Sequence, residues 1–260
     1  GDYPDVSALN AGNDLLLMPT DVAKSIKELK KAIQKNKIST KNLEKAVKKN
    51  LMAKYKSGLN NFKPIEIENI VEDLNQDIDY ALLDRLAEDS MTLVKNHNTN
   101  LPISISDQKS IGYINMGDDS YNTFLKYLNK YSKVDHIYQN NKNFLIEISK
   151  NYDKVIVGLH KSDKSPFGEY KFTEDEISII NDLKKLTDLT LVVFSKPYSI
   201  FDLNIDDIQS ILIAYQNSTV FQEKAAQAIF GAIDVKGKLP VTINKDIPVN
   251  TSIKLKKKRF

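Results

Sequence analysis

Downstream of residue 109, the hydrophobic and polar positions of the chain alternate between two patterns. The stretches that predict strands, several of them continuously apolar, are 109–120, 133–138, 153–158, 189–195 and 210–215. Between them, apolar residues recur at helical spacing, which predicts helices over 121–131, 144–149, 172–186 and 218–230. Short buried strands that alternate with amphipathic helices indicate an α/β domain with a doubly wound, mostly parallel sheet sandwiched by helices. We place this domain at residues 87–248.

Two of these helices carry sequence signals at their ends. Thr173 and Glu176 have the spacing of a capping box, with Phe172 and Ile177 placed for a hydrophobic staple. Gly231 follows the last apolar position of the final helix and predicts its end.

The N-terminal part has a different pattern. Within 8–19 (ALNAGNDLLLMP), four apolar residues before a proline predict a short strand. One helix follows Asp21, and a second begins at Ser39 and ends near Gly58. A single strand cannot form a sheet, and the apolar faces of two helices need a partner. We therefore expect residues 1–60 to form a separate piece.

Two further segments complete the predicted organisation. A linker and helix occupy 61–86, and the helical pattern extends over Asp77–Val94. Residues 249–260 form a basic tail that contains the run Lys254–Arg259. A tail of this kind is typically solvated.

Composition narrows the function classes without choosing one. The chain has 260 residues and a formal net charge of +3, which is too balanced to suggest a nucleic-acid binder. It has no cysteine, which excludes disulfides, a thiolate nucleophile and cysteine-ligated metals. No apolar run reaches membrane-spanning length, and no N-terminal signal pattern is present. The abundance of Lys, Asn, Ile and Asp is typical of AT-rich bacterial genomes.

Candidate catalytic groups follow the strand at 153–158. His160 lies in a segment where ligands bind in parallel sheets, beyond the carboxyl end of a strand. Glu169 and Asp163 share this loop and have the chemistry of acid/base carboxylates. The alternative, which the residues alone favour, is a surface histidine beside solvated charges. For Asp14 in the opening strand, the sequence is equally consistent with a structural role at the end of the strand and with a role in a binding pocket.

Signatures of cofactor sites are missing. Neither His97, His136 nor His160 has metal-ligand spacing, so we expect no metal. There is no glycine-rich phosphate loop, and Asp118 and Asp119 would repel a phosphate, so a nucleotide-binding domain is disfavoured and no cofactor is expected. The nucleophile elbow of α/β-hydrolases is also absent.

Several stretches, in order and spacing, resemble glycoside hydrolase family 3 over nearly the whole chain. In chain order they are DVSALNAGNDLLLMPTDVAKSIKELKKAI, ISTKNLEKAVKKNLMAKYKSGL, LAEDSMTLVKNHNTNLPI, KVIVG, LVVFSKPYSI, SILIAYQNS and FQEKAAQAIFGAIDVKGKLPVTI. The first two are similar to the closing strand and helices of the family's (β/α)₈ barrel, and the others to its C-terminal α/β sandwich domain. The β-N-acetylhexosaminidase branch is the most similar.

The resemblance implies a retaining glycosidase whose catalytic groups are not in this chain. In the family pattern, the aspartate nucleophile and the branch's His-Asp acid/base pair lie upstream of ALNAGND. Other branches take an acid/base glutamate from the sandwich domain, and Glu169 is the one residue here in a comparable loop. We expect no catalytic residue in this chain, with Glu169 and His160 as weak candidates, and no activity of the chain alone on terminal β-N-acetylglucosaminides or β-glucosides.

The resemblance also bears on partners and compartment. The expected partners are the missing N-terminal barrel, a carbohydrate in the parent protein and, for the isolated chain, a second copy. An alternative function is a non-catalytic carbohydrate- or protein-interaction module, for which Tyr121, Tyr170 and Tyr198 would form an aromatic platform. The resemblance favours a periplasmic or extracellular parent, with a cytoplasmic one as the alternative.

Overall fold

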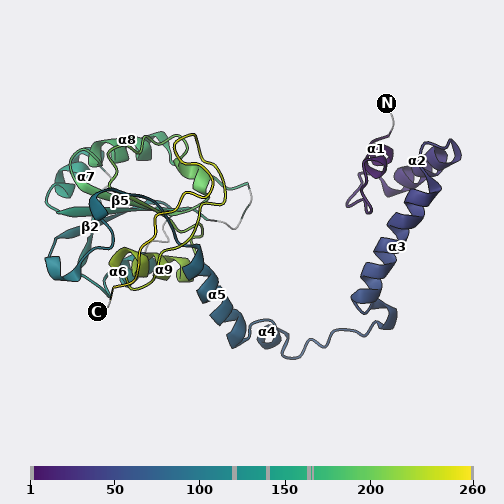
Figure 1. Cartoon of the computed structure of the whole chain (residues 1–260), viewed down its shortest axis with the longest axis horizontal. Coiled ribbons are helices and arrows are strands. Elements are labelled where there is room, and N and C mark those ends of the chain that lie inside the picture. The colour runs from purple at the N-terminus through teal and green to yellow at the C-terminus, as the bar shows by residue number, and fades with distance from the viewer. Residues whose placement is uncertain (1–2, 119–121, 139–140, 163–164, 166, 259–260) are drawn as a thin grey trace. The chain divides into compact units, whose positions relative to one another are not determined.

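The computed structural model describes residues 3–118, 122–138, 141–162, 165 and 167–258. Within it the chain divides into two compact units, Gly1–Val71 and Glu72–Phe260 (Figure 1).

The second unit is built on a six-stranded sheet. The strand order is β1-β6-β5-β4-β2-β3. All neighbouring strands are parallel except β1 and β6, which pair antiparallel. The strands are β1 (Thr92–Asn96), β2 (Ile111–Gly117), β3 (Val134–His136), β4 (Lys154–His160), β5 (Asp188–Phe194) and β6 (Ser210–Ile213).

Helices cover both faces of this sheet, as Figure 1 shows. One face carries α6 and α9, and the other carries α7 and α8. The helices are α5 (Asp77–Ser90), α6 (Asn122–Leu128), α7 (Lys142–Ser149), α8 (Glu174–Leu183) and α9 (Thr219–Phe230). The predicted α/β class with a mostly parallel, helix-covered sheet is therefore confirmed.

The continuous apolar runs are explained by burial on both faces. Successive strand side chains point to opposite faces, so one strand feeds two cores. Ile156, Val192 and Phe194 pack in the core on the α9 side, whereas Val155 and Val157 pack in the core on the α8 side. Every residue of β4 is buried.

The end signals of two helices act as expected. The N–H of Glu176 donates to Thr173 Oγ1 at 3.2 Å, and the N–H of Thr173 donates to Glu176 Oε2 at 2.7 Å, which completes the capping box of α8. Gly231 ends α9 with a φ of 76°, a left-handed conformation that glycine adopts without steric cost.

The helix predicted over Asp77–Val94 is shorter than expected. It ends at Ser90, and Leu93 and Val94 belong to β1. Leu93 is fully buried and lies opposite Leu212 of β6. A local helical spacing cannot reveal this pairing, because the partner strand lies more than a hundred residues downstream in the chain.

The first unit is small and helical. Its elements are α1 (Pro4–Asn10), α2 (Val22–Gln34), α3 (Thr40–Lys56) and a 3₁₀ turn η1 (Leu59–Asn61), and α4 (Ile70–Asp73) follows at the boundary. A minor core of Val6, Ala32 and Ile38 holds α1 against α2 and the start of α3.

The predicted opening strand is wrong for this structure. Residues 4–10 are helical, and beyond them Leu15, Leu17 and Met18, where the strand was predicted, have exposed fractions of 68%, 84% and 88% without strand pairing. The physical reason is that a strand needs a hydrogen-bonded neighbour. The described part of the first unit provides none.

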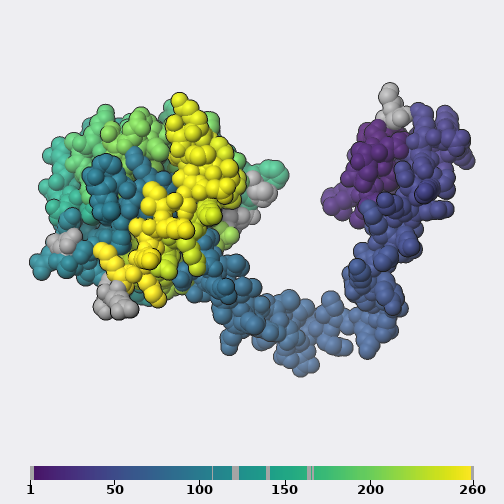
Figure 2. Space-filling model, viewed as in Figure 1, coloured from purple at the N-terminus to yellow at the C-terminus, as the bar shows by residue number. Residues whose placement is uncertain are grey.

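The C-terminal segment combines a basic surface with core contacts. Its lysines are exposed, as in a basic tail. Ile253, however, forms a bridge with Leu93, and Leu255 forms one with Val235. Figure 2 shows the segment, in yellow, across the surface of the second unit. No helix in the described part of the chain is long and apolar enough to cross a membrane.

Candidate functional site

The carboxyl edge of the parallel strands carries the polar groups that the sequence pattern singled out. In the ladder, Gly117 at the end of β2 lies beside His160 at the end of β4, and His160 lies beside Phe194 at the end of β5. Asp118 continues from β2 and Asn217 follows β6. Ligands of open α/β sheets bind at this edge, so it is the candidate site.

His160 lies at the centre of this edge and is fully buried. Its Nε2 lies 2.6 Å from the hydroxyl of Tyr113, and its Nδ1 lies 2.7 Å from Asn217 Oδ1. Gln222 Nε2 also donates to Asn217 Oδ1, at 2.9 Å. The ring stacks on Phe194 with centroids 4.6 Å apart.

This arrangement assigns the tautomer of His160. Because Asn217 Oδ1 is an acceptor, Nδ1 of His160 carries the hydrogen, and Nε2 accepts from the hydroxyl of Tyr113. Burial lowers the pKa of His160 to about 4, against the opposing effects of the Asn217 hydrogen bond and the Asp118 charge. The ring is therefore neutral at pH 7, and its two hydrogen bonds join β4 to Tyr113 of β2 and to Asn217 in the segment after β6.

The expectation of a surface-loop histidine is wrong. His160 is the last residue of β4 rather than a loop residue, because β4 continues two residues past the predicted end of the strand. Its partners Tyr113 and Asn217 were not singled out from the sequence. They lie 47 and 57 residues away in the chain, so no local pattern joins them to His160.

Two glycines make room for this cluster. At Gly158, an added Cβ would lie 2.7 Å from both the Tyr113 hydroxyl and His160 Nε2. At Gly117, the φ is +86° and an added Cβ would lie 2.2 Å from the carbonyl oxygen of His160. Glycines within or at the end of a strand are a sequence signal that the backbone or a side chain approaches closely.

The loop after β4 is fastened at both of its ends. The N–H of Ser162 donates to Asp118 Oδ2, and Lys161 Nζ lies 3.9 Å from Glu176 Oε2. At the far end, the hydroxyl of Ser195 donates to the carbonyl oxygen of Tyr170 at 2.9 Å.

The candidate acid/base residues differ in environment. Glu169 is exposed on this loop, whereas the His160 side chain is buried, so the two are not presented together to one surface. Asp163, together with Asp119 and Tyr121, lies outside the described residues. Glu169 is thus the one described loop carboxylate among the candidates that solvent and a substrate can reach.

The candidate aromatic platform is only partly exposed. Tyr170 is half-buried, with Lys196 Nζ 4.9 Å from its ring centroid. Tyr198 has an exposed fraction of 42%.

The remaining singled-out residues have structural contacts. Asp14 is paired with Lys49 within the first unit. His136 Nε2 lies 2.8 Å from Asn115 Oδ1, and burial lowers the pKa of His136. Among the described residues, no group of three or more histidine, aspartate or glutamate side chains is placed to hold a metal ion.

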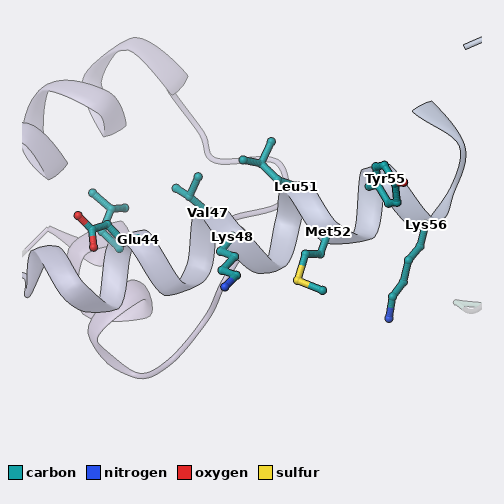
Figure 3. Close-up of a pocket in the computed structure, with 8 residues that line it drawn as sticks. Glu44, Val47, Lys48, Leu51, Met52, Tyr55 and Lys56 are labelled. Atoms are coloured by element: carbon teal, nitrogen blue, oxygen red, sulfur yellow. The ribbon is translucent and has the colours of Figure 1, made fainter. Parts of the chain in front are cut away.

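The first unit has an open apolar hollow along α3, shown in Figure 3. Val47, Leu51, Met52 and Tyr55 line it, with exposed fractions of 48%, 59%, 49% and 68%. An exposed patch of this kind on a soluble chain is typical of an interaction surface.

The sequence model of the glycosyl hydrolase family 3 C-terminal domain matches residues 91–259. The chain belongs to glycosyl hydrolase family 3. The match begins at Met91, immediately before β1, and covers the whole sheet of the second unit, including the edge with His160.

A curated relative and two solved structures match most of the chain. A β-xylosidase of Formosa agariphila is 26% identical over 84% of this chain and 36% of its own length. A family 3 β-N-acetylglucosaminidase from Paenibacillus sp. has a TM-score of 0.63 at 19% identity, covering 94% of this chain and 48% of that chain. A β-glucosidase from Listeria innocua has a TM-score of 0.66 at 18% identity, covering 92% of this chain and 37% of that chain.

These relatives are much longer than the chain. The chain spans about a third of the curated relative and between about a third and a half of these two solved structures. The likenesses to solved structures confirm the fold. The names of these three proteins state different sugars, namely xylose, N-acetylglucosamine and glucose.

Proposed function

We propose that this chain is the C-terminal part of a retaining family 3 glycosidase that hydrolyses terminal β-glycosides, with β-N-acetylglucosaminides as the first candidate substrates and β-glucosides as the second. The observation that carries this proposal is the family match over the whole sheet of the second unit. The β-N-acetylglucosaminidase, β-glucosidase and β-xylosidase names of its relatives support the class of reaction.

The chain alone is inactive in this proposal. A retaining glycosidase needs two carboxyl groups about 5 Å apart across the scissile bond, or an equivalent pair. At the carboxyl edge, His160 is buried and hydrogen-bonded on both nitrogens, which leaves Glu169 as the one exposed candidate among the described residues. The proposal places the nucleophile and the acid/base upstream of the ALNAGND stretch, as the family resemblance implies.

The upstream barrel is also the proposed partner of the first unit. The apolar side chains along α3 are more exposed than a folded soluble protein tolerates over a continuous helix face. In a complete (β/α)₈ barrel, the helices form an outer ring and bury such faces against neighbouring units. The segment around Leu15–Met18 would gain the neighbouring strands that it lacks here.

The test compares this chain with the same chain extended upstream to include a whole barrel. Hydrolysis of chromogenic β-N-acetylglucosaminide, β-glucoside and β-xyloside is measured for both proteins at equal concentration. The proposal predicts turnover only by the extended protein, with the β-N-acetylglucosaminide preferred. Turnover by the short chain would contradict the missing-nucleophile argument, and preference for the xyloside would contradict the substrate assignment.

A second comparison tests whether the loop after β4 contributes. Glu169→Gln is made in the extended protein, with Glu174→Gln, an exposed acid in the first turn of α8, as the matched control. If the catalytic pair is entirely upstream, both variants keep kcat within about twofold. A loss of several hundredfold for Glu169→Gln alone would show that this loop supplies the acid/base.

A further inference from the structure

A concave site lies at the amino edge of the sheet, opposite to the edge that carries His160. It is a pocket of about 350 Å³, within the range of about 300 to 1,000 Å³ that is typical of small-molecule sites. Its walls come from the loop between β1 and β2, the first residues of β4 and β5, the residue before β6, and the C-terminal segment. The lining is mostly polar, which suits a small charged ligand.

The floor of the pocket holds a fixed ammonium group. Lys154, the first residue of β4, is only 5% exposed, and its Nζ donates to Asn100 Oδ1 and Asp188 Oδ2. Asn100 is itself held, because its Nδ2 donates to Thr190 Oγ1 at 3.2 Å and to Ser210 Oγ at 3.1 Å. The position of the charge is therefore set by the sheet and not by a flexible side chain.

The rim adds positive charge. Lys109 and Lys258 line the pocket and are exposed. Asp188 is the one acidic residue among the described lining residues, and Lys154 pairs with it. Three lysines against one aspartate leave a formal surplus of two positive charges. Asp153, outside the lining, also acts on Lys109 electrostatically and offsets part of this surplus.

The loop that forms one wall is held in a costly conformation. Thr99 has a φ of 52°, which is an outlier for a β-branched residue. The turn is kept by an N–H···O bond of 3.0 Å from Asn100 to the carbonyl oxygen of His97. A second bond, of 2.9 Å, runs from the N–H of Leu101 to Asn96 Oδ1. Backbone strain of this kind is concentrated at ligand sites, where the surrounding structure maintains it.

We propose that this pocket binds a phosphate group, either free or carried on a small hydroxylated molecule such as a sugar. Lysine ammonium groups bind phosphate as point charges. Lys154 fixes an ammonium group on the floor, where Asp188 balances its charge, and Lys109 and Lys258 supply the surplus positive charge from the rim. The site does not depend on the glycosidase activity, and it lies at the edge of the sheet opposite to His160.

The test is a titration of the whole, isotopically labelled chain followed by amide NMR shifts. Inorganic phosphate and glucose 6-phosphate are the probes, and sodium chloride at equal ionic strength is the control. The proposal predicts saturable shifts centred on the amides of Asn100, Lys154 and Gln209. Equal affinity for the two probes would identify the free phosphate ion as the ligand of the pocket. Tighter binding of glucose 6-phosphate would identify a phosphate ester as the ligand.

Variants separate this site from general attraction to a basic surface. The double variant Lys109→Gln/Lys258→Gln is expected to weaken binding at least tenfold. Lys126→Gln, an exposed lysine on α6, is the matched control and is expected to bind as the unaltered chain does. Unsaturable shifts spread over other surface lysines, or a double variant that binds as tightly as the control, would overturn the proposal. Because both altered lysines are exposed, the double variant tests binding without disturbing the core.

Discussion

The buried histidine at the carboxyl edge gives the second unit a pH-dependent stability that can be calculated. Burial lowers the pKa of His160 to about 4, from an ordinary value of 6.5. As the pH falls below 6.5, the unfolded chain takes up a proton on this histidine before the folded chain does. The free energy of unfolding therefore decreases between pH 6.5 and pH 4 and is not affected by this group above or below that window.

The size of the effect follows from the two pKa values. Between pH 7 and pH 4.5, linkage to this single group removes about 2 kcal/mol from the free energy of unfolding. The full shift corresponds to about 3 kcal/mol once the pH is below 4. Such a change is a large fraction of the stability of a typical domain, which is about 5 to 15 kcal/mol.

The assay is urea denaturation at pH 7 and pH 4.5, followed by far-UV circular dichroism because the chain has no tryptophan. His160→Gln keeps a donor and an acceptor but cannot take up a proton. Other groups that titrate in this range, including His136 and the carboxylates, cancel when the two proteins are compared. The unaltered chain should lose about 2 kcal/mol more than the variant between the two pH values. Equal losses in the two proteins would refute the assigned burial and protonation of His160.

Three further predictions follow from the same structure. Asn217→Asp places a carboxylate beside Nδ1 of His160, so it should raise the histidine's pKa and flatten the loss of stability between pH 6.5 and 4; an unchanged pH profile in urea melts would contradict the observed contact. Gly117→Ala should cost about 2 to 3 kcal/mol in urea melts, because its φ of +86° and its closeness to the His160 carbonyl leave no room for a Cβ, whereas Gly168→Ala, whose nearest atom would be 3.3 Å away, should cost about 1 kcal/mol or less. Leu51→Lys on α3 should change the free energy of unfolding of the isolated chain by no more than about 0.5 kcal/mol, because that side chain is 59% exposed. The same substitution should destabilise the barrel-extended protein. A large decrease in the free energy of unfolding of the isolated chain would show that the apolar face of α3 is already covered.

The parts of the fold that were predictable from the sequence depend on local signals. The strand β4 contains a continuous apolar run, and the capping residues Thr173 and Glu176 are three residues apart in the sequence. Both features can therefore be predicted without knowledge of the rest of the chain. The strand β1 is different. Its Leu93 continues the helical spacing of α5, and only pairing with β6 makes it a strand. Tertiary pairing overrode the local pattern there.

The candidate site shows the same division. The position of His160 next to the carboxyl end of a strand was predictable, because strand ends converge at one edge. Its burial was not, because the hydroxyl of Tyr113 and the amide of Asn217 reach it from distant parts of the chain. The amino-edge pocket was missed entirely for the same reason, since Lys154, Asn100 and Asp188 meet only after the sheet has formed.

In the first unit, the sequence predicted a strand that the structure does not contain. The apolar run around Leu15–Met18 has the composition of a buried strand, yet it is exposed in this chain. Composition indicates the environment for which a segment is suited, whereas structure depends on whether the neighbours are present. This contrast is what the proposed upstream barrel explains.

The most direct test of the central proposal is to locate the covalent intermediate. The barrel-extended protein is treated with a 5-fluoro-glycoside of the preferred sugar, which keeps the C2 substituent and traps the glycosyl-enzyme of a retaining glycosidase, and the labelled peptide is identified by mass spectrometry. We predict a labelled aspartate in the upstream barrel and an unlabelled segment 1–260. A label on any carboxylate within residues 1–260, such as Glu169, would contradict it.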